Sequence, residues 1–251
     1  MFLILKSIFK IKIHLFFYVF MFISLITGHF FDFLIFSIII FVHELGHIFA
    51  GLFFKWNLEK IVILPFGGVS IFKCFINTSL LEQFIVTLMG PLFQICFFAF
   101  LNHFFVLSNS LIFFNNLLLF FNLLPIFPLD GSKFLYIFLC IFLPFRCSFF
   151  IFLFISFGLI AFLMFSYFNF TFFCVLFFLF VKCLHELISF PYIFNKFLFE
   201  RYFNCFNFKH TKIVKGVSGM YLWCKHKFFL NNNYVSEREY LSKMFDKSND
   251  L

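Results

Sequence analysis

Apolar runs of about 20 residues follow one another along most of this chain, and they limit the folds that it can adopt. Hydrophobic residues make up 63% of the 251 residues, charged residues make up only 12%, and the mean hydropathy is +1.05. A soluble domain of this size could not bury so much apolar surface. The composition therefore predicts an all-α polytopic membrane protein.

The lengths of the apolar runs predict six transmembrane helices, at roughly 13–28, 32–54, 83–105, 110–136, 148–166 and 170–188. Between the second and third, NLEKIVILPFGGVSIFKCF is too short and too broken by Gly and Pro to cross a membrane. Its β-branched residues on both sides of a Gly-Gly pair predict a re-entrant β-hairpin at about 61–76. We expect a membrane domain over 1–194 and a short, basic cytoplasmic tail over 195–251.

Lysine and arginine positions predict the orientation, because cytoplasmic loops are enriched in both. With the N-terminus in the cytoplasm, the outer loops near 28–32, 104–110 and 166–171 contain neither residue. We therefore expect both termini inside the cell. The net charge of +8 then reflects the basic residues of the cytoplasmic loops and of the tail. Next to a bilayer, we expect a basic tail to contact anionic headgroups. No motif for binding DNA or RNA is present.

The second predicted span contains HELGH, residues 43–47, which matches the pattern His-Glu-x-x-His. Ionisable side chains at membrane depth cost several kcal/mol, so they are usually functional. On a helix, His43 and His47 lie one turn apart on one face and can converge on a single Zn²⁺. Glu44 lies on the same side and is placed to exchange a proton with water. We expect the small Gly46 to allow another helix to approach closely.

A second HEL, at residues 185–187, offers an internal comparison. Ser189 stands where the second histidine would be, so the pattern is incomplete. His185 and Glu186 also lie near a predicted helix end, which favours a polar pair that reaches toward the interface. The complete motif therefore occurs once.

A catalytic zinc ion takes three protein ligands, and the sequence offers few candidates for the third. Asp130, in FNLLPIFPLDGSKFL, ends an apolar run and precedes Lys133, which places it at a cytoplasmic half-depth similar to that of His47. Pro125 and Pro128 break the helix there, which a membrane tolerates where the chain lines a protein cavity. The alternative is an ordinary PLDG turn in which the aspartate caps a helix.

HELGH, MGPLFQ (residues 89–94) and FNLLPIFPLDG resemble, in this order, the motifs of the site-2 intramembrane zinc metalloproteases. The resemblance covers roughly residues 10–205, and the family often has Asn where this chain has Gln94. It implies that His43, His47 and Asp130 hold Zn²⁺ and that Glu44 is the general base.

Further roles follow from the same resemblance. It implies that Asn122 contacts the substrate or stabilises the oxyanion; the alternative is that Asn122 satisfies carbonyls freed near Pro125. An open edge of the hairpin would pair with an extended substrate, although the hairpin could instead only fill the cavity. The expected substrate-contacting residues are Pro65, Phe66, Gly67, Gly68, Val69 and Pro128.

LITGHF, ILPFGGV and LFERYF resemble one branch of the family, which cleaves a membrane-tethered pro-sigma factor during sporulation. This implies a pro-sigma substrate, inhibitory membrane proteins as partners, a homo-oligomer as one assembly state, and the bacterial membrane around the forespore. Ser132 replaces a second glycine of that branch. Members of the branch carry a CBS-like domain linked to ATP, and the short tail predicts a shortened version whose last helix is YVSEREYLSKMF, residues 234–245.

Three alternatives remain at this stage. The chain could be a site-2 protease with another membrane substrate, or a membrane scaffold that binds zinc and cuts nothing. The intact Glu44 argues against the scaffold, because a protein without activity needs no general base. A transporter would be favoured by inverted repeats, and no second half of the sequence resembles the first.

Overall fold

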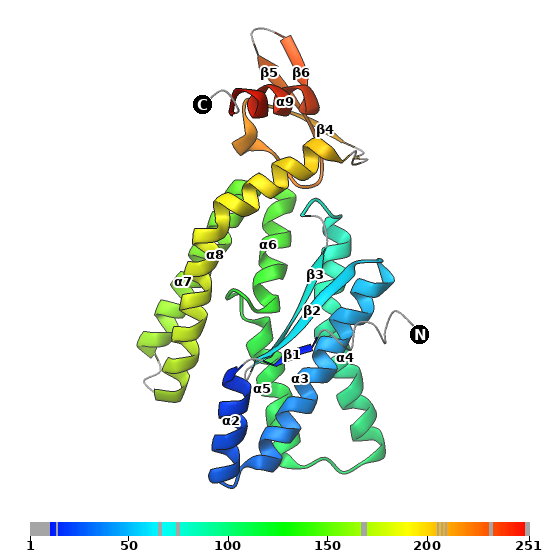
Figure 1. Ribbon diagram of the computed structural model, residues 1–251. Helices are drawn as coiled ribbons and strands as arrows, with labels where there is room; N and C mark the ends of the chain where they lie inside the picture. The colour runs from blue at the N-terminus through cyan, green and yellow to red at the C-terminus, as the bar shows by residue number, and fades with distance from the viewer. Residues whose placement is uncertain are drawn as a thin grey trace. The chain divides into compact units, whose positions relative to one another are not determined.

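The computed structural model describes residues 11–248 except 14, 65–66, 74–75, 167–169, 205, 207, 209 and 231–232. The chain divides into two compact units (Figure 1). Unit 1 consists of residues 1–74 and 84–123, and unit 2 consists of residues 75–83 and 124–251.

Unit 1 combines apolar helices with a small sheet. Its helices are α2 (Leu15–Ile26), α3 (Phe30–Phe53), most of α4 (Leu80–Phe104) and α5 (Asn109–Leu123). Its strands are β1 (Ile11–Ile13), β2 (Asn57–Leu64) and β3 (Gly67–Lys73), in the order β1-β2-β3. β1 pairs with β2 in parallel, and β2 and β3 form an antiparallel hairpin.

Two apolar clusters hold unit 1 together around α3. Ile39 and Ile40 pack with Leu118 of α5, and Ile48 packs with Leu58 and Ile61 of β2. Figure 1 shows β2 and β3 running beside α3. The hairpin predicted at 61–76 is therefore present with bounds of 57–73, and its re-entry into a membrane stays a prediction.

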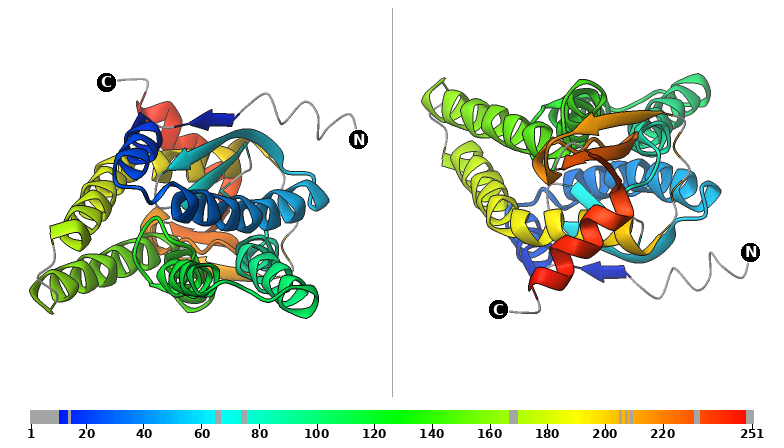
Figure 2. Two further views of the ribbon diagram at one scale, coloured as in Figure 1. Left: turned by 90° about the horizontal axis from the view of Figure 1, so that it is seen from below. Right: turned by 90° about the horizontal axis from the view of Figure 1, so that it is seen from above.

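Unit 2 contains three apolar helices and a polar C-terminal region. The helices are α6 (Asp130–Phe142), α7 (Phe145–Ser166) and α8 (Phe170–Phe203). α7 and α8 lie side by side (Figures 1 and 2), and the rings of Phe145 and Phe197 stack with centroids 4.5 Å apart. Such aromatic pairs add to the free energy of burying apolar area.

The C-terminal region folds into a second small sheet covered by a helix. β4 (Thr211–Val214), β5 (Lys225–Leu230) and β6 (Asn233–Ser236) pair in the order β4-β5-β6, after the short helix η1 (Val217–Gly219) between β4 and β5. The last helix, α9 (Glu237–Ser248), packs on β5 and β6. The helix predicted over 234–245 thus begins later, because its first residues belong to β6.

Four helices among the described residues are long and apolar enough to cross a membrane: Phe30–Phe53, Leu80–Phe104, Phe145–Ser166 and Phe172–Phe203. Phe17–Ile26 and Asn109–Leu123 are apolar but shorter. The helix predicted over 110–136 is in fact two helices, since α5 ends at Leu123 and α6 begins at Asp130. Six spans are therefore not confirmed, whereas a largely helical fold with four candidate membrane spans is.

Side chains from α7 and α8 satisfy the backbone in the break between α5 and α6. Ser156 donates to the carbonyl of Pro125 at 3.2 Å and accepts from the N–H of Phe127 at 3.3 Å. Cys183 donates to the carbonyl of Phe127 at 3.5 Å. An unpaired backbone group would be costly in an apolar setting, so these bonds make the interruption tolerable.

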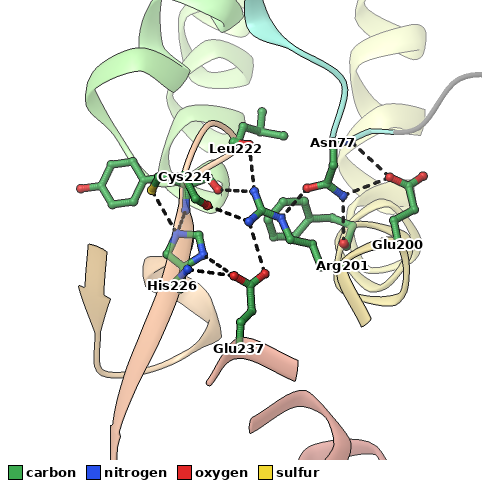
Figure 3. A network of polar contacts seen from close by, with 9 residues as sticks. Asn77, Glu200, Arg201, Leu222, Cys224, His226 and Glu237 are labelled. Atoms are coloured by element: carbon green, nitrogen blue, oxygen red, sulfur yellow. Dashed lines mark hydrogen bonds and ion pairs between the residues drawn. The ribbon is translucent and has the colours of Figure 1, made fainter. Parts of the chain in front are cut away.

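One buried arginine ties the end of α8 to the C-terminal sheet and to the segment before α4 (Figure 3). Arg201 donates to Asn77 Oδ1 at 2.6 Å and to Glu237 Oε1 at 3.2 Å. It also donates to the carbonyls of Cys224, Tyr221 and Leu222 at 2.7, 2.7 and 2.8 Å. These five bonds use all five guanidinium donors, which compensates for burying the charge.

We predict that acid unfolds the C-terminal region. Burial lowers the pKa of His226. Burial raises the pKa of Glu237, but the hydrogen bond from His226 and the charge of Arg201 outweigh it, so the net pKa is lowered. Both groups bind protons more readily in the unfolded chain. The free energy of unfolding should therefore decrease as the pH drops below 6.5, the ordinary pKa of histidine. It should decrease further below pH 4.5, the ordinary pKa of glutamate.

Trp223 fluorescence in a Trp56→Phe variant would report this transition, because the chain has two tryptophans. Glu239→Gln is the matched control, since Glu239 is exposed on the same helix. It should leave the acid transition unchanged. An emission spectrum that stays constant as the pH falls through both values would contradict the prediction.

Candidate metal centre

Two imidazoles and a carboxylate are buried side by side on α3. His43, Glu44 and His47 are 3%, 6% and 5% exposed. The ring centroids of His43 and His47 are 4.9 Å apart, and their Nε2 atoms are separated by 3.2 Å. The spacing of one helical turn thus brings the two nitrogen atoms together, as the sequence predicts.

Hydrogen bonds at the other nitrogen of each ring define its protonation. The carbonyl oxygen of Val86 lies 2.8 Å from His47 Nδ1, and Gln94 Oε1 lies 3.0 Å from His43 Nδ1. Both oxygens can only accept, so each Nδ1 carries the proton in the neutral ring. Each Nε2 then presents a lone pair, which is the state in which histidine binds a metal.

The separation of the two Nε2 atoms fits a metal ion. Two facing lone pairs 3.2 Å apart repel one another unless a cation lies between them. A tetrahedral ion with metal–nitrogen bonds of about 2.0–2.1 Å would hold two nitrogens about 3.3 Å apart. The observed spacing agrees with this value, so the pair is suited to a metal such as zinc.

Two glycines allow α4 to approach the histidines. A Cβ added at Gly46 would strike the backbone of Met89, which confirms the close approach expected at Gly46. A Cβ added at Gly90 would lie against Nε2 of His47 and 3.0 Å from Nε2 of His43. Pro91 lies inside α4.

The carboxylate of Glu44 contacts the β-hairpin. Ser70 on β3 donates to Glu44 Oε2 at 2.6 Å, and a Cβ added at Gly68 would collide with the Glu44 side chain. Gly68 and Ser70 are two residues apart, so they share one face of β3. The strand therefore fixes one oxygen of Glu44.

Asp130 is the first residue of α6 in unit 2. Its carboxylate is 5% exposed and accepts a hydrogen bond from Lys133 at 2.8 Å. The helix N-terminus also stabilises its negative charge. Its role as the third ligand beside His43 and His47 stays a prediction. Ser132 stands where the sporulation branch of the family has a glycine. It is buried, and its hydroxyl donates to the carbonyl of Leu129 at 2.7 Å.

The other predicted site residues are distributed as follows. Asn122 lies near the end of α5 and is 8% exposed. Since the Pro125 carbonyl accepts from Ser156, that group does not require Asn122. Pro128 precedes Leu129 in the break before α6. Gly67, Gly68 and Val69 begin β3, whereas Pro65 and Phe66 lie outside the described residues.

Sequence reasoning missed two contributors to this centre, Ser70 and Asn115, the second of which accepts two hydrogen bonds from Gln94. Asn115 lies two helical turns before Asn122, and both are on the buried face of α5 with Leu118. That periodicity was readable in the sequence and could have identified Asn115 as buried. Nothing in the local sequence could have paired Ser70 with Glu44, because the contact depends on the fold.

Comparison with known proteins agrees with the motifs. Residues 31–110 match Peptidase family M50. The chain is 34% identical over 152 residues to "Stage IV sporulation protein FB" of Bacillus subtilis (strain 168), covering 57% of this chain and 52% of that protein. It thus spans about half the length of this curated relative.

A solved structure is also similar in fold. The site-2 protease from Methanocaldococcus jannaschii superimposes with a TM-score of 0.56, covering 70% of this chain and 89% of that one. The two sequences are 24% identical, so this likeness concerns the fold alone.

We predict that Gly90→Ala abolishes metal binding. Its added methyl group would occupy the space beside both Nε2 atoms, where an ion would bind. Elemental analysis of the purified chain should find about one zinc per wild-type molecule and little in the variant. Gly158→Ala is the control, because Gly158 on α7 has nothing within 4 Å of an added Cβ. Equal zinc in Gly90→Ala and wild type would contradict the assigned position.

Proposed function

We propose that the chain is a site-2 protease of peptidase family M50, an intramembrane zinc metalloendopeptidase, and the family match over residues 31–110 and the likeness to the sporulation protein support this. It hydrolyses a peptide bond in a membrane-associated protein, near the cytoplasmic face. The observation that carries this proposal is the facing pair of Nε2 atoms, 3.2 Å apart, next to a carboxylate held by Ser70. These are the ligands and the proton acceptor that metal-assisted hydrolysis requires.

In this proposal His43, His47 and Asp130 hold the zinc ion. The histidines support it through their fixed Nδ1–H groups, and Asp130 supports it as a buried carboxylate at a helix N-terminus. When bound, zinc would lower the pKa of a water molecule toward about 7 and polarise the scissile carbonyl. Lys133 can adjust to metal binding, since its side chain is 51% exposed.

Glu44 is the proposed general base. Its carboxylate accepts a proton from the water that attacks the scissile carbonyl, and it returns that proton to the leaving amine. The hydrogen bond from Ser70 to Oε2 orients the carboxylate throughout. Asn122 is the proposed donor to the oxyanion or to the substrate, in agreement with its buried position near the end of α5.

The outer edge of β3 is the proposed site of substrate pairing. β1 occupies the outer edge of β2, and in the part of the chain that the structure describes no strand pairs with the other edge of β3. A substrate added there would be held extended, which exposes the peptide bond that a helix hides. Gly67, Gly68 and Val69 would contact its backbone, and the contacts predicted for Pro65, Phe66 and Pro128 remain part of the proposal.

The likeness to a sporulation protein supports a proposal for the substrate. We propose a pro-sigma factor as substrate, in the bacterial membrane around the forespore, with both termini in the cytoplasm. Inhibitory membrane proteins and a homo-oligomer belong to the same proposal. So do the division into a membrane domain over 1–194 and a CBS-like tail over 195–251. A different membrane substrate is the alternative.

We predict that Glu44→Gln abolishes cleavage and Glu186→Gln does not. Glu186 belongs to the incomplete motif HELIS, so it provides a matched control in the same sequence context. Loss of a general base should lower the rate by about 10²–10⁴-fold. Co-expression with a candidate pro-sigma factor, followed by gel analysis of its size, measures the outcome.

Zinc content decides how a negative result is interpreted. Glu44→Gln should retain about one zinc per chain, because Glu44 is not a ligand. Cleavage that persists in Glu44→Gln would overturn the mechanism. A wild-type chain that holds zinc but cuts no membrane protein would favour the scaffold.

A further inference from the structure

Gln94 is the last residue of the motif MGPLFQ. The proposed mechanism assigns no role to this residue. Its side chain is 1% exposed, and that of Asn115 on α5 is 5% exposed. Gln94 Nε2 donates to the carbonyl oxygen of Asn115 at 2.9 Å and to Asn115 Oδ1 at 3.1 Å. Gln94 Oε1 lies 3.0 Å from His43 Nδ1.

These three contacts determine which way the Gln94 amide faces. The two amide hydrogens point to two oxygen atoms of Asn115, and the amide oxygen points to His43. If the amide were turned over, its oxygen would face two oxygen atoms of Asn115, and the backbone carbonyl among them can only accept. Inside a protein such unsatisfied groups are expensive, so the observed orientation is strongly preferred.

His43 needs such a constraint more than His47 does. The Nδ1 of His47 faces a backbone carbonyl, which accepts whatever side chains surround it. If the proton of His43 moved to Nε2, it could be donated to His47 Nε2 at 3.2 Å. That imidazole–imidazole hydrogen bond would occupy both nitrogens that the metal requires.

We propose that Gln94 is a positioning residue, oriented by Asn115, that keeps His43 in the tautomer with Nε2 open to the metal. The proposal rests on the proposed function, because it assumes that His43 is a metal ligand there. Partners of this kind on metal-binding histidines typically change metal affinity by 10–100-fold when removed. Asn115 acts only through Gln94 in this scheme, so the two residues should not contribute independently.

The first test measures zinc affinity of the full chain in detergent by competition with a chelator. Gln94→Leu should weaken zinc binding by about 10–100-fold. Asn115→Leu should weaken it less, because the backbone carbonyl of residue 115 still accepts from Gln94. The double variant should bind no more weakly than Gln94→Leu. Gln83→Leu, on the same helix, is the control and should bind zinc as the wild type does.

The second test observes the tautomer directly in the metal-free chain. Nitrogen-15 NMR of labelled histidine should find the proton of His43 on Nδ1 in the wild type and on Nε2, at least in part, in Gln94→Leu. His47 should keep its proton on Nδ1 in both. A variant that folds and binds zinc like the wild type, with His43 unchanged, would overturn the proposal. If Gln94→Leu fails to fold, Asn115→Leu gives the same readouts.

These measurements separate the inference from the proposed function. Neither readout requires proteolysis, so a wild type that cuts nothing would refute the protease and leave both tests valid. If the wild type bound no zinc, the proposed metal centre would fail. The tautomer of His43 would still decide whether Gln94 positions it.

Discussion

The close packing of α4 against the histidine-bearing face of α3 is the contact on which the arrangement of the two imidazoles depends. Two glycines make it possible, because Gly46 leaves room for the backbone of Met89 and Gly90 leaves room for the imidazoles. Without this approach, neither the Val86 carbonyl nor Gln94 could reach a ring nitrogen. Each imidazole would then lose the acceptor of its Nδ1–H group, and a buried N–H without that bond costs several kcal/mol.

The buried polar groups of unit 2 also require hydrogen-bond partners. The broken backbone around Pro125 is satisfied by Ser156 and Cys183, and the guanidinium of Arg201 is satisfied by five acceptors. Buried polar groups in this mostly apolar chain are thus stabilised by several partners at once. Among the described residues, the buried carboxylates and guanidinium are Glu44 on α3, Asp130 on α6 and the group around Arg201.

Local sequence was sufficient to predict the parts of the centre that lie on one element. The spacing in HELGH brought His43 and His47 together, and the small size of Gly46 indicated a close helix contact. The break near Asp130 was also evident from two prolines, although the apolar pattern around it led us to expect one helix where there are two. Patterns of hydrophobicity mark apolar segments better than they mark helix ends.

Contacts between distant segments could not be predicted. The bond from Ser70 to Glu44 and the chain from Asn115 through Gln94 to His43 join residues on different elements. The pairing of β1 with β2 and the fold of the C-terminal region could not be predicted either, because they also join distant segments. These features depend on tertiary packing, for which a single sequence contains no direct signal.

The central claim is that His43, His47 and Asp130 hold one zinc ion while Glu44 does not. X-ray absorption spectroscopy of the zinc-loaded chain tests it most directly. The account predicts a four-coordinate ion with only nitrogen and oxygen neighbours at about 2.0–2.2 Å, two of them imidazoles, and the same spectrum for Glu44→Gln. A sulfur neighbour at about 2.3 Å, or a single imidazole, would contradict the account.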